Sequence, residues 1–163
     1  MLFNSFTFIV FFVIVSAVYF LFPHKLRWVL LLFSSCIFYM AWDPWLICLI
    51  LLTIFINYLS AIFIYSTNRG TARKILIAAM AAGFGLLFIF KYLGFMNDTL
   101  LAIFGENWPV KTLNIILPMG ISFYTFQAAS YTIDVYRGTI KPEKHFGIFA
   151  LFVMFFPQLV AGP

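Results

Sequence analysis

Polar side chains recur along one side of residues 117–137, a segment that is otherwise long and apolar enough to enter a lipid bilayer. On a helix that turns about 100° per residue, one narrow sector holds Gly120, Tyr124, Gln127, Tyr131 and Asp134. The phenol, amide and carboxyl groups of this polar stripe donate or accept hydrogen bonds, and the carboxyl group can also hold a charge. Because such groups cost a few kcal/mol at bilayer depth, the stripe predicts a surface that faces protein or water and has a functional use.

For one residue of the polar stripe, Asp134, a purely structural role is an alternative to a functional one. Asp134 lies near the end of the apolar run, where the headgroup boundary is expected, and it could simply pair with Arg137. Both interpretations stay open for Asp134, whereas Gln127 lies nearer the middle of the segment, where the structural one is weaker. A second polar candidate is Gln158, which follows Pro157 in another apolar run. A helix that breaks inside a membrane leaves backbone groups that protein or water must satisfy, so such breaks tend to line cavities.

No residue of the sequence forms a catalytic site by itself. His24 and His145 lie in short basic loops, where we interpret them as solvated side chains, because a general base needs an orienting partner and a nearby substrate. Ser34 and Ser35 lie in an apolar run without a nearby base, so packing explains them better. The sequence therefore gives no candidate catalytic residue and, since no His, Cys or acidic residues have metal-ligand spacing, no metal site.

The composition excludes a water-soluble domain. Hydrophobic residues make up 64% and charged residues 9% of the 163 positions, far too little polar cover for a soluble domain of this size. The apolar runs do not alternate with polar residues, so the expected spans are helices and not β-barrel strands. Cys36 and Cys48 lie inside apolar runs as packing residues, which argues against a disulfide framework. The net charge of +5 is typical of loops beside an anionic membrane surface and gives no ground for nucleic-acid binding.

The apolar segments predict an all-α, polytopic transmembrane bundle. About 20 residues form roughly 30 Å of helix, which is enough to cross the hydrocarbon core. The expected spans are about 3–22, 26–42, 44–65, 73–96, 113–136 and a sixth that starts near Phe146. Residues 97–112 are too short and too polar to cross, so we expect a short amphipathic or re-entrant helix at the membrane surface. Pro157 should bend or end the sixth helix, because proline lacks an N–H donor and its ring clashes with the preceding turn.

The loop charges predict that the N-terminus lies outside. In that orientation the cytoplasmic side holds eight of the ten basic residues, namely Lys25, Arg27, Arg69, Arg73, Lys74, Arg137, Lys141 and Lys144. The positive-inside rule is then met at all three inner loops. Positive charge follows the first apolar run and does not precede it, so we expect an uncleaved helix and not a signal peptide. The four tryptophans fall at predicted span ends, as interface anchors do.

Two motifs in the later part of the chain resemble those of a known family. The segment LPMGISFYTFQAASYTIDVYRG at 117–138 is followed, after a short basic loop, by FFPQLVAGP at 155–163. Together with an early MLFNSFTF and with FYMAWDPWL at 38–46, they resemble the membrane-bound O-acyltransferase family. The resemblance is strongest to the bacterial branch that contains the alginate O-acetyltransferase membrane subunit, and it covers essentially the whole chain.

The resemblance implies a multi-pass enzyme of the bacterial inner membrane, with helices packed around a tunnel. Such enzymes pass an acyl group from a cytoplasmic donor, acetyl-CoA or an acyl carrier, to an extracytoplasmic acceptor such as alginate. The donor is a substrate, and no bound cofactor is implied. The implied partners are membrane lipid and, in the polysaccharide-modifying branch, extracytoplasmic acetyltransferase partner proteins. The family's catalytic histidine lies in the second half of the protein, and neither His24 nor His145 occupies that position.

The chain is accordingly expected to be a single membrane domain, 1–163, that forms the N-terminal portion of a larger fold and is inactive without the C-terminal half. The residues expected to line one wall of the tunnel are Tyr124, Gln127, Tyr131, Asp134 and Gln158. Two alternatives stay open: a transporter or channel segment whose conduction path the polar stripe lines, and a non-catalytic membrane scaffold. Inverted repeats with paired broken helices would favour transport, and the sequence shows none. Further spans downstream with a membrane-embedded histidine would favour the enzyme.

Overall fold

The computed structural model describes residues 6–41, 44–104 and 120–161, and every regular element in these ranges is helical. The longer elements are α1 (Phe6–Leu21), α2 (Arg27–Met40), α3 (Ile47–Ser66), α4 (Arg69–Phe104), α5 (Ile121–Arg137), α6 (Phe146–Met154) and α7 (Phe156–Ala161). Two short 3-10 turns, η1 (His24–Leu26) and η2 (Pro44–Leu46), precede α2 and α3. The expected all-α class is therefore confirmed for the described ranges.

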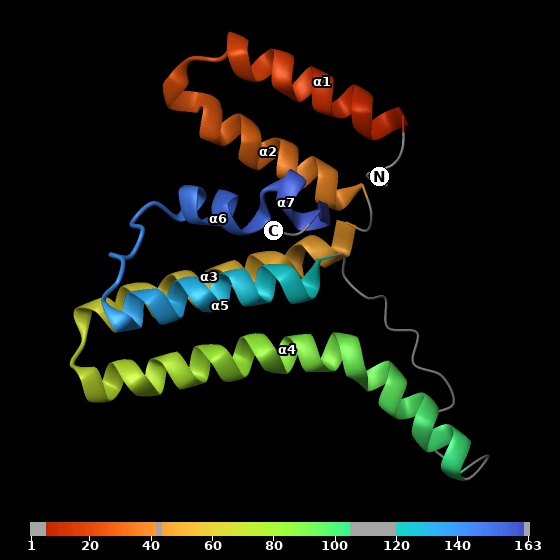
Figure 1. Ribbon diagram of the computed structural model, residues 1–163, viewed down its shortest axis with the longest axis vertical. Helices are drawn as coiled ribbons and strands as arrows, with labels where there is room; N and C mark the ends of the chain where they lie inside the picture. The colour runs from red at the N-terminus through yellow and green to blue at the C-terminus, as the bar shows by residue number, and fades with distance from the viewer. Residues whose placement is uncertain (1–5, 42–43, 105–119, 162–163) are drawn as a thin grey trace.

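The helices form a layered bundle around a central pair. Across the molecule they follow the order α1, α2, α6 with α7, α3 with α5, and α4 (Figure 1). The centre of the core holds fully buried side chains from three helices, including Ile50 and Ile54 of α3, Tyr124 of α5 and Phe149 of α6. A second cluster joins α1 and α2 to α7 through Phe8, Phe38 and Phe156.

Large apolar side chains also cover the outside of the bundle. On α1, α3 and α4 respectively, Ile14 is 56%, Phe55 is 52% and Phe95 is 70% exposed. The segment Pro44–Ser66 is 23 residues long and Arg69–Ile103 is 35 residues long, and both are long and apolar enough to cross a bilayer. So large an exposed apolar surface is typical of a protein that lies in lipid. This is a membrane protein.

The fourth helix is longer than the sequence predicts. Residues 97–104, expected to belong to a separate interfacial helix, continue α4 without a break. The local chemistry permits this, because Asn97 is buried and the Thr99 hydroxyl donates to the Phe95 carbonyl of its own helix at 2.8 Å. The rest of the expected interfacial helix, 105–112, and the start of the expected fifth span, 113–119, lie outside the described residues. The described part of that span begins at Gly120, whose φ of 72° places it in the left-handed region that favours glycine.

The three basic turns expected on one side of the membrane lie at the same end of the bundle. They are η1, the turn at 67–68 between α3 and α4, and the segment 138–145 between α5 and α6 (Figure 1). Gly138, with φ of 80°, ends α5 by donating its N–H to the Val135 carbonyl at 3.0 Å. This shared end fits the predicted placement of the three basic loops on one side of the membrane.

Aromatic and hydrogen-bond contacts fasten the 138–145 segment to the bundle. The Tyr58 hydroxyl donates to the Lys144 carbonyl at 2.6 Å, and the His145 ring meets the Trp28 ring edge to face, with 4.7 Å between centroids. Gly147 lies directly beneath that indole, and a Cβ atom at this position would overlap the ring. His145 is exposed, as expected, but its ring also holds Trp28 in place.

Candidate functional site

The helix break predicted at Pro157 is confirmed. α6 ends at Met154, Phe155 takes an extended ψ of 114°, and α7 begins at Phe156. Pro157 therefore lies in the first turn of α7, where its missing N–H costs nothing.

Two side chains from other helices satisfy the backbone groups that the break sets free. In an unbroken helix the Phe156 N–H would donate to the Phe152 carbonyl. Here the Phe152 carbonyl accepts from Nε2 of Gln127 on α5 at 2.8 Å. The Phe156 N–H donates to Oγ of Ser35 on α2 at 3.2 Å, and the Ser35 hydroxyl donates to the Leu31 carbonyl at 2.8 Å. The break is thus held from both sides.

Gln127 and Gln158 meet at this break. Nε2 of Gln127 also approaches Oε1 of Gln158 at 3.5 Å, and both residues are half-buried. Oε1 of Gln127 is buried and has no hydrogen-bond partner among the described residues. The two candidates that the sequence placed on separate segments therefore form one amide pair, and its free acceptor can take a hydrogen bond from a hydroxyl or an N–H group. We call Gln127 and Gln158 the amide pair.

The rest of the polar stripe continues from the amide pair along α5. The Tyr131 ring packs against the Phe149 ring at a tilt of 39°, with 4.5 Å between centroids, and its hydroxyl accepts the Glu143 N–H at 2.7 Å. Tyr124 is fully buried, and its hydroxyl has no hydrogen bond of good geometry among the described residues. Asp134 is half-buried near the C-terminal end of α5, and the described residues show no ion pair between it and Arg137. The stripe therefore runs from the core to the basic end of the bundle.

A second polar contact, which the sequence did not single out, joins α3 to α5. Asn57 is 2% exposed and donates from Nδ2 to the Thr53 carbonyl at 2.9 Å. Its Oδ1 accepts from the Thr132 hydroxyl at 2.8 Å. The signal in the sequence that could have identified this contact is the single asparagine, Asn57, inside an apolar run. Ser35 was likewise interpreted as a packing residue only, and its bond to the Phe156 N–H corrects that interpretation.

Comparison with known proteins identifies the relatives of the chain. It is 37% identical to the probable alginate O-acetylase of Azotobacter vinelandii and 38% identical to that of Pseudomonas aeruginosa, with 100% of this chain matched in both cases. A peptidoglycan O-acetyltransferase of Helicobacter pylori is 33% identical over 82% of the chain. The chain belongs to the membrane-bound O-acyltransferase family.

The chain matches only part of the length of each of these relatives. The chain spans 34%, 32% and 30% of the length of the Azotobacter, Pseudomonas aeruginosa and Helicobacter proteins, respectively. No family model matches the chain, and no solved structure shows significant similarity to it. Within the described ranges, no group of three or more His, Cys, Asp or Glu residues could hold a metal ion, and both histidines are exposed.

We expect Asn57 and Thr132 to be energetically coupled. Thr132→Val removes the hydroxyl and leaves Oδ1 of Asn57 without its donor, whereas Asn57→Leu removes both amide groups. In a double-mutant cycle the coupling should be about 0.6 to 1.7 kcal/mol, the range of interhelical hydrogen bonds in membranes. The measurement is the unfolding of the full-length protein in mixed micelles with increasing denaturing detergent.

Thr99→Val is the matched control for this cycle. The Thr99 hydroxyl is exposed and bonds the Phe95 carbonyl of its own helix, so its loss should change stability by less than about 0.5 kcal/mol. A coupling of zero between Asn57 and Thr132 would show that the α3–α5 contact rests on apolar packing alone.

Proposed function

We propose that this chain forms part of a multi-pass O-acetyltransferase of the bacterial inner membrane, which transfers acetyl groups to an extracytoplasmic polysaccharide such as alginate. The observation that carries the proposal is the match of the whole chain, at 34–38% identity, to proteins named probable alginate O-acetylase. The peptidoglycan O-acetyltransferase of Helicobacter pylori, at 33% identity, makes peptidoglycan the second candidate acceptor. The donor would be acetyl-CoA or an acyl carrier on the cytoplasmic side.

In the proposed topology about six spans cross the membrane, and the N-terminus lies outside. The three basic turns that share one end of the bundle then lie in the cytoplasm, in accord with the positive-inside rule. The acceptor polymer and the extracytoplasmic acetyltransferase partner proteins would approach from the opposite end.

The chain would supply one wall of the transfer tunnel, at the broken helix. The amide pair offers a buried, unpaired acceptor there, at Oε1 of Gln127. Such an acceptor can orient the hydroxyl or amide group of a substrate, because a buried polar atom without a partner is costly and gains most from a ligand. Tyr124, Tyr131 and Asp134 would continue this wall along α5. The catalytic base would come from the remaining two thirds of the protein, since both histidines of this chain are exposed.

A transfer assay on membranes that contain the full-length protein tests this function. Labelled acetyl-CoA is supplied, and alginate or peptidoglycan is offered with the partner proteins present. We expect labelled O-acetyl groups on one of the two polymers.

Gln158→Leu tests the tunnel wall in the same assay. It removes an amide at the proposed wall but leaves the Gln127–Phe152 bond intact, so we expect transfer to fall by about tenfold, the worth of one hydrogen bond of about 1.4 kcal/mol. The control is Ser130→Ala on the exposed side of α5. Unchanged transfer by Gln158→Leu would contradict the tunnel wall without touching the assigned reaction, whereas an inactive wild type would contradict the reaction.

A further inference from the structure

We propose that a groove between α1 and the α2–α7 side of the bundle binds an anionic membrane phospholipid, with an acyl chain along α1 and the phosphate at η1. This site goes beyond the proposed acyl transfer, because it lies on the far side of the broken helix from Gln127. Two adjoining cavities carry the inference, one apolar and one basic.

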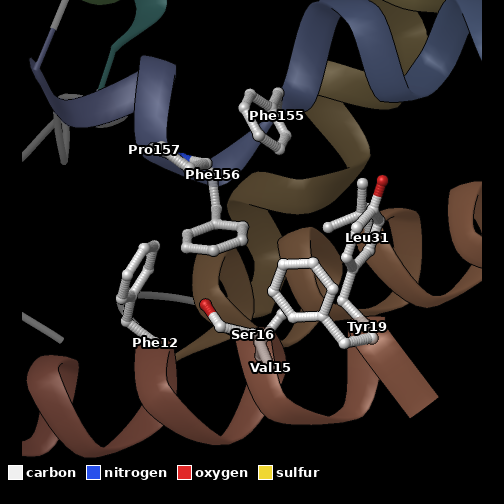
Figure 2. A pocket seen from close by; sticks show the side chains of 9 residues that line it. Phe12, Val15, Ser16, Tyr19, Leu31, Phe155, Phe156 and Pro157 are labelled. Atoms are coloured by element: carbon white, nitrogen blue, oxygen red, sulfur yellow. The ribbon is translucent and has the colours of Figure 1, made fainter. Parts of the chain in front are cut away.

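The apolar cavity has a volume of about 300 Å³. It is lined by Phe12, Val15, Ser16, Tyr19, Phe20, Leu31, Phe155, Phe156 and Pro157. Figure 2 shows the ring of Phe156 reaching across towards α1, with Phe12 on one side of it and the Ser16 hydroxyl beneath. Apart from the Ser16 and Tyr19 hydroxyls, its lining side chains are hydrocarbon, which suits an acyl chain and offers little to a polar ligand.

The basic cavity adjoins the apolar one and has a volume of about 420 Å³. It is lined by Tyr19, His24, Lys25, Arg27, Trp28, Leu31 and Leu151. Tyr19 and Leu31 line both cavities, so the two lie next to one another along α1 and α2. None of the residues that line the basic cavity is acidic, so its two permanent positive charges are not neutralised within it.

Arg27 is already held in place for an anion. Its Nε donates to the Phe22 carbonyl at 3.2 Å, and its guanidinium carbon lies 4.9 Å from the centre of the Tyr19 ring. These two contacts fix the plane of the guanidinium but leave its terminal Nη donors without a partner among the described residues. A fixed guanidinium with free terminal donors is the preferred protein group for phosphate oxygens.

The order of the two cavities selects a phospholipid as the occupant. A soluble phosphate compound would use the basic cavity alone, and a neutral lipid would use the apolar cavity alone. A phospholipid fills both, because its phosphate lies at the membrane boundary and its chains extend into the hydrocarbon. The basic cavity is lined by residues of η1 and the start of α2, and η1 lies at the end of the bundle that carries the three basic turns, where the boundary is expected (Figure 1). The apolar cavity is lined by Phe12, Val15 and Ser16, which lie further from that end along α1.

The test measures phospholipid retained by the purified full-length protein. The protein is exchanged into detergent with equal amounts of phosphatidylglycerol and phosphatidylcholine, and bound lipid is counted by native mass spectrometry. The double variant Lys25→Gln with Arg27→Gln should lose about thirtyfold in retained phosphatidylglycerol, since each of the two basic residues near a membrane surface contributes about 1 kcal/mol. The matched control is Arg73→Gln with Lys74→Gln, which removes the same charge from exposed positions on α4 and should retain lipid like the wild type.

Ser16→Trp tests the apolar half of the groove. The indole would fill the cavity beside Phe156, so retention of phosphatidylglycerol should fall although the basic residues are intact. Glycerol 3-phosphate, which has the headgroup without the chains, should not displace the lipid at equal concentration. If Lys25→Gln with Arg27→Gln fails to fold, Arg27→Lys replaces it, because it keeps the charge but loses the planar fork, and it should lose part of the retention.

Three results would overturn the proposal. The first is equal retention of phosphatidylglycerol and phosphatidylcholine by the wild type, which would show that charge is not selected. The second is full retention by Ser16→Trp, or displacement by glycerol 3-phosphate, which would show a headgroup site alone. The third is a wild-type protein without bound phospholipid, which would show that another segment of the full-length chain fills the groove.

Discussion

Gln127→Leu is expected to destabilise the full-length protein and to lower the proposed acetyl transfer more than any other change to the polar stripe. The substitution removes the donor to the Phe152 carbonyl and leaves that carbonyl unsatisfied beside the helix break. Neither lipid nor leucine offers a donor that could replace the lost bond, so the unsatisfied carbonyl should cost about 1–3 kcal/mol. We expect a lower thermal unfolding midpoint in detergent, together with at least about tenfold less labelled acetyl transferred, by the arithmetic of 1.4 kcal/mol per decade.

The control for Gln127→Leu lies less than one turn away on α5. The exposed Ser130 hydroxyl donates to the Gln127 carbonyl of its own helix at 2.9 Å, so Ser130→Ala should shift stability by less than about 0.5 kcal/mol. If the two variants unfold at the same midpoint, the Gln127 amide does not hold the break. The comparison with Gln158→Leu then separates the effects, because that variant should lose transfer with little loss of stability.

Among the glycines whose surroundings the structure describes, Gly147 is the one at which substitution by alanine should lower stability most. The new Cβ would overlap the Trp28 indole, which must then turn away from the His145 ring. Overpacking of this kind costs about 1–3 kcal/mol, and we expect a correspondingly lower thermal unfolding midpoint in detergent.

Gly85→Ala is the matched control for Gly147→Ala. Nothing lies within 4 Å of a Cβ at Gly85, so alanine there should leave stability unchanged or raise it, as alanine favours helix by up to about 1 kcal/mol over glycine. Combining Gly147→Ala with Trp28→Phe should restore most of the loss, because the smaller ring leaves room for the methyl group. A double variant no more stable than Gly147→Ala alone would place the strain elsewhere.

The sequence was a good guide to the helices, because apolar length and loop charge act locally along the chain. Residues 44–65 match α3, and Pro157 ends α6, as a missing donor and a steric clash require. The separate helix expected at 97–112 was wrong for its described part, 97–104, which continues α4. The polar residues there predicted a helix at the membrane surface. Asn97 is buried, however, and the Thr99 hydroxyl bonds a carbonyl of its own helix, so both residues are compatible with a continuing helix.

The candidate site could be predicted one segment at a time but not as an assembly. Helical periodicity grouped Gln127 with Tyr131, and the proline break drew attention to Gln158. The contact between Gln127 and the Phe152 carbonyl joins residues 25 positions apart, and the bond from the Phe156 N–H to Ser35 joins residues 121 positions apart. Neither follows from periodicity, because each depends on how the helices pack. The same holds for Asn57 and Thr132, 75 positions apart.

The broken helix also constrains the order in which this protein can assemble. The carbonyl and the N–H that the break sets free are satisfied by α5 and α2, both of which precede α6 and α7 along the chain. In hydrocarbon each unsatisfied backbone group costs several kcal/mol, so α6 and α7 can pack stably only where those two earlier helices already lie on either side of the break. Synthesis from the N-terminus produces α2 and α5 before α6 and α7. A circular permutation in which α6 and α7 were synthesised before α2 would leave the Phe156 N–H at the break without its partner until α2 was made.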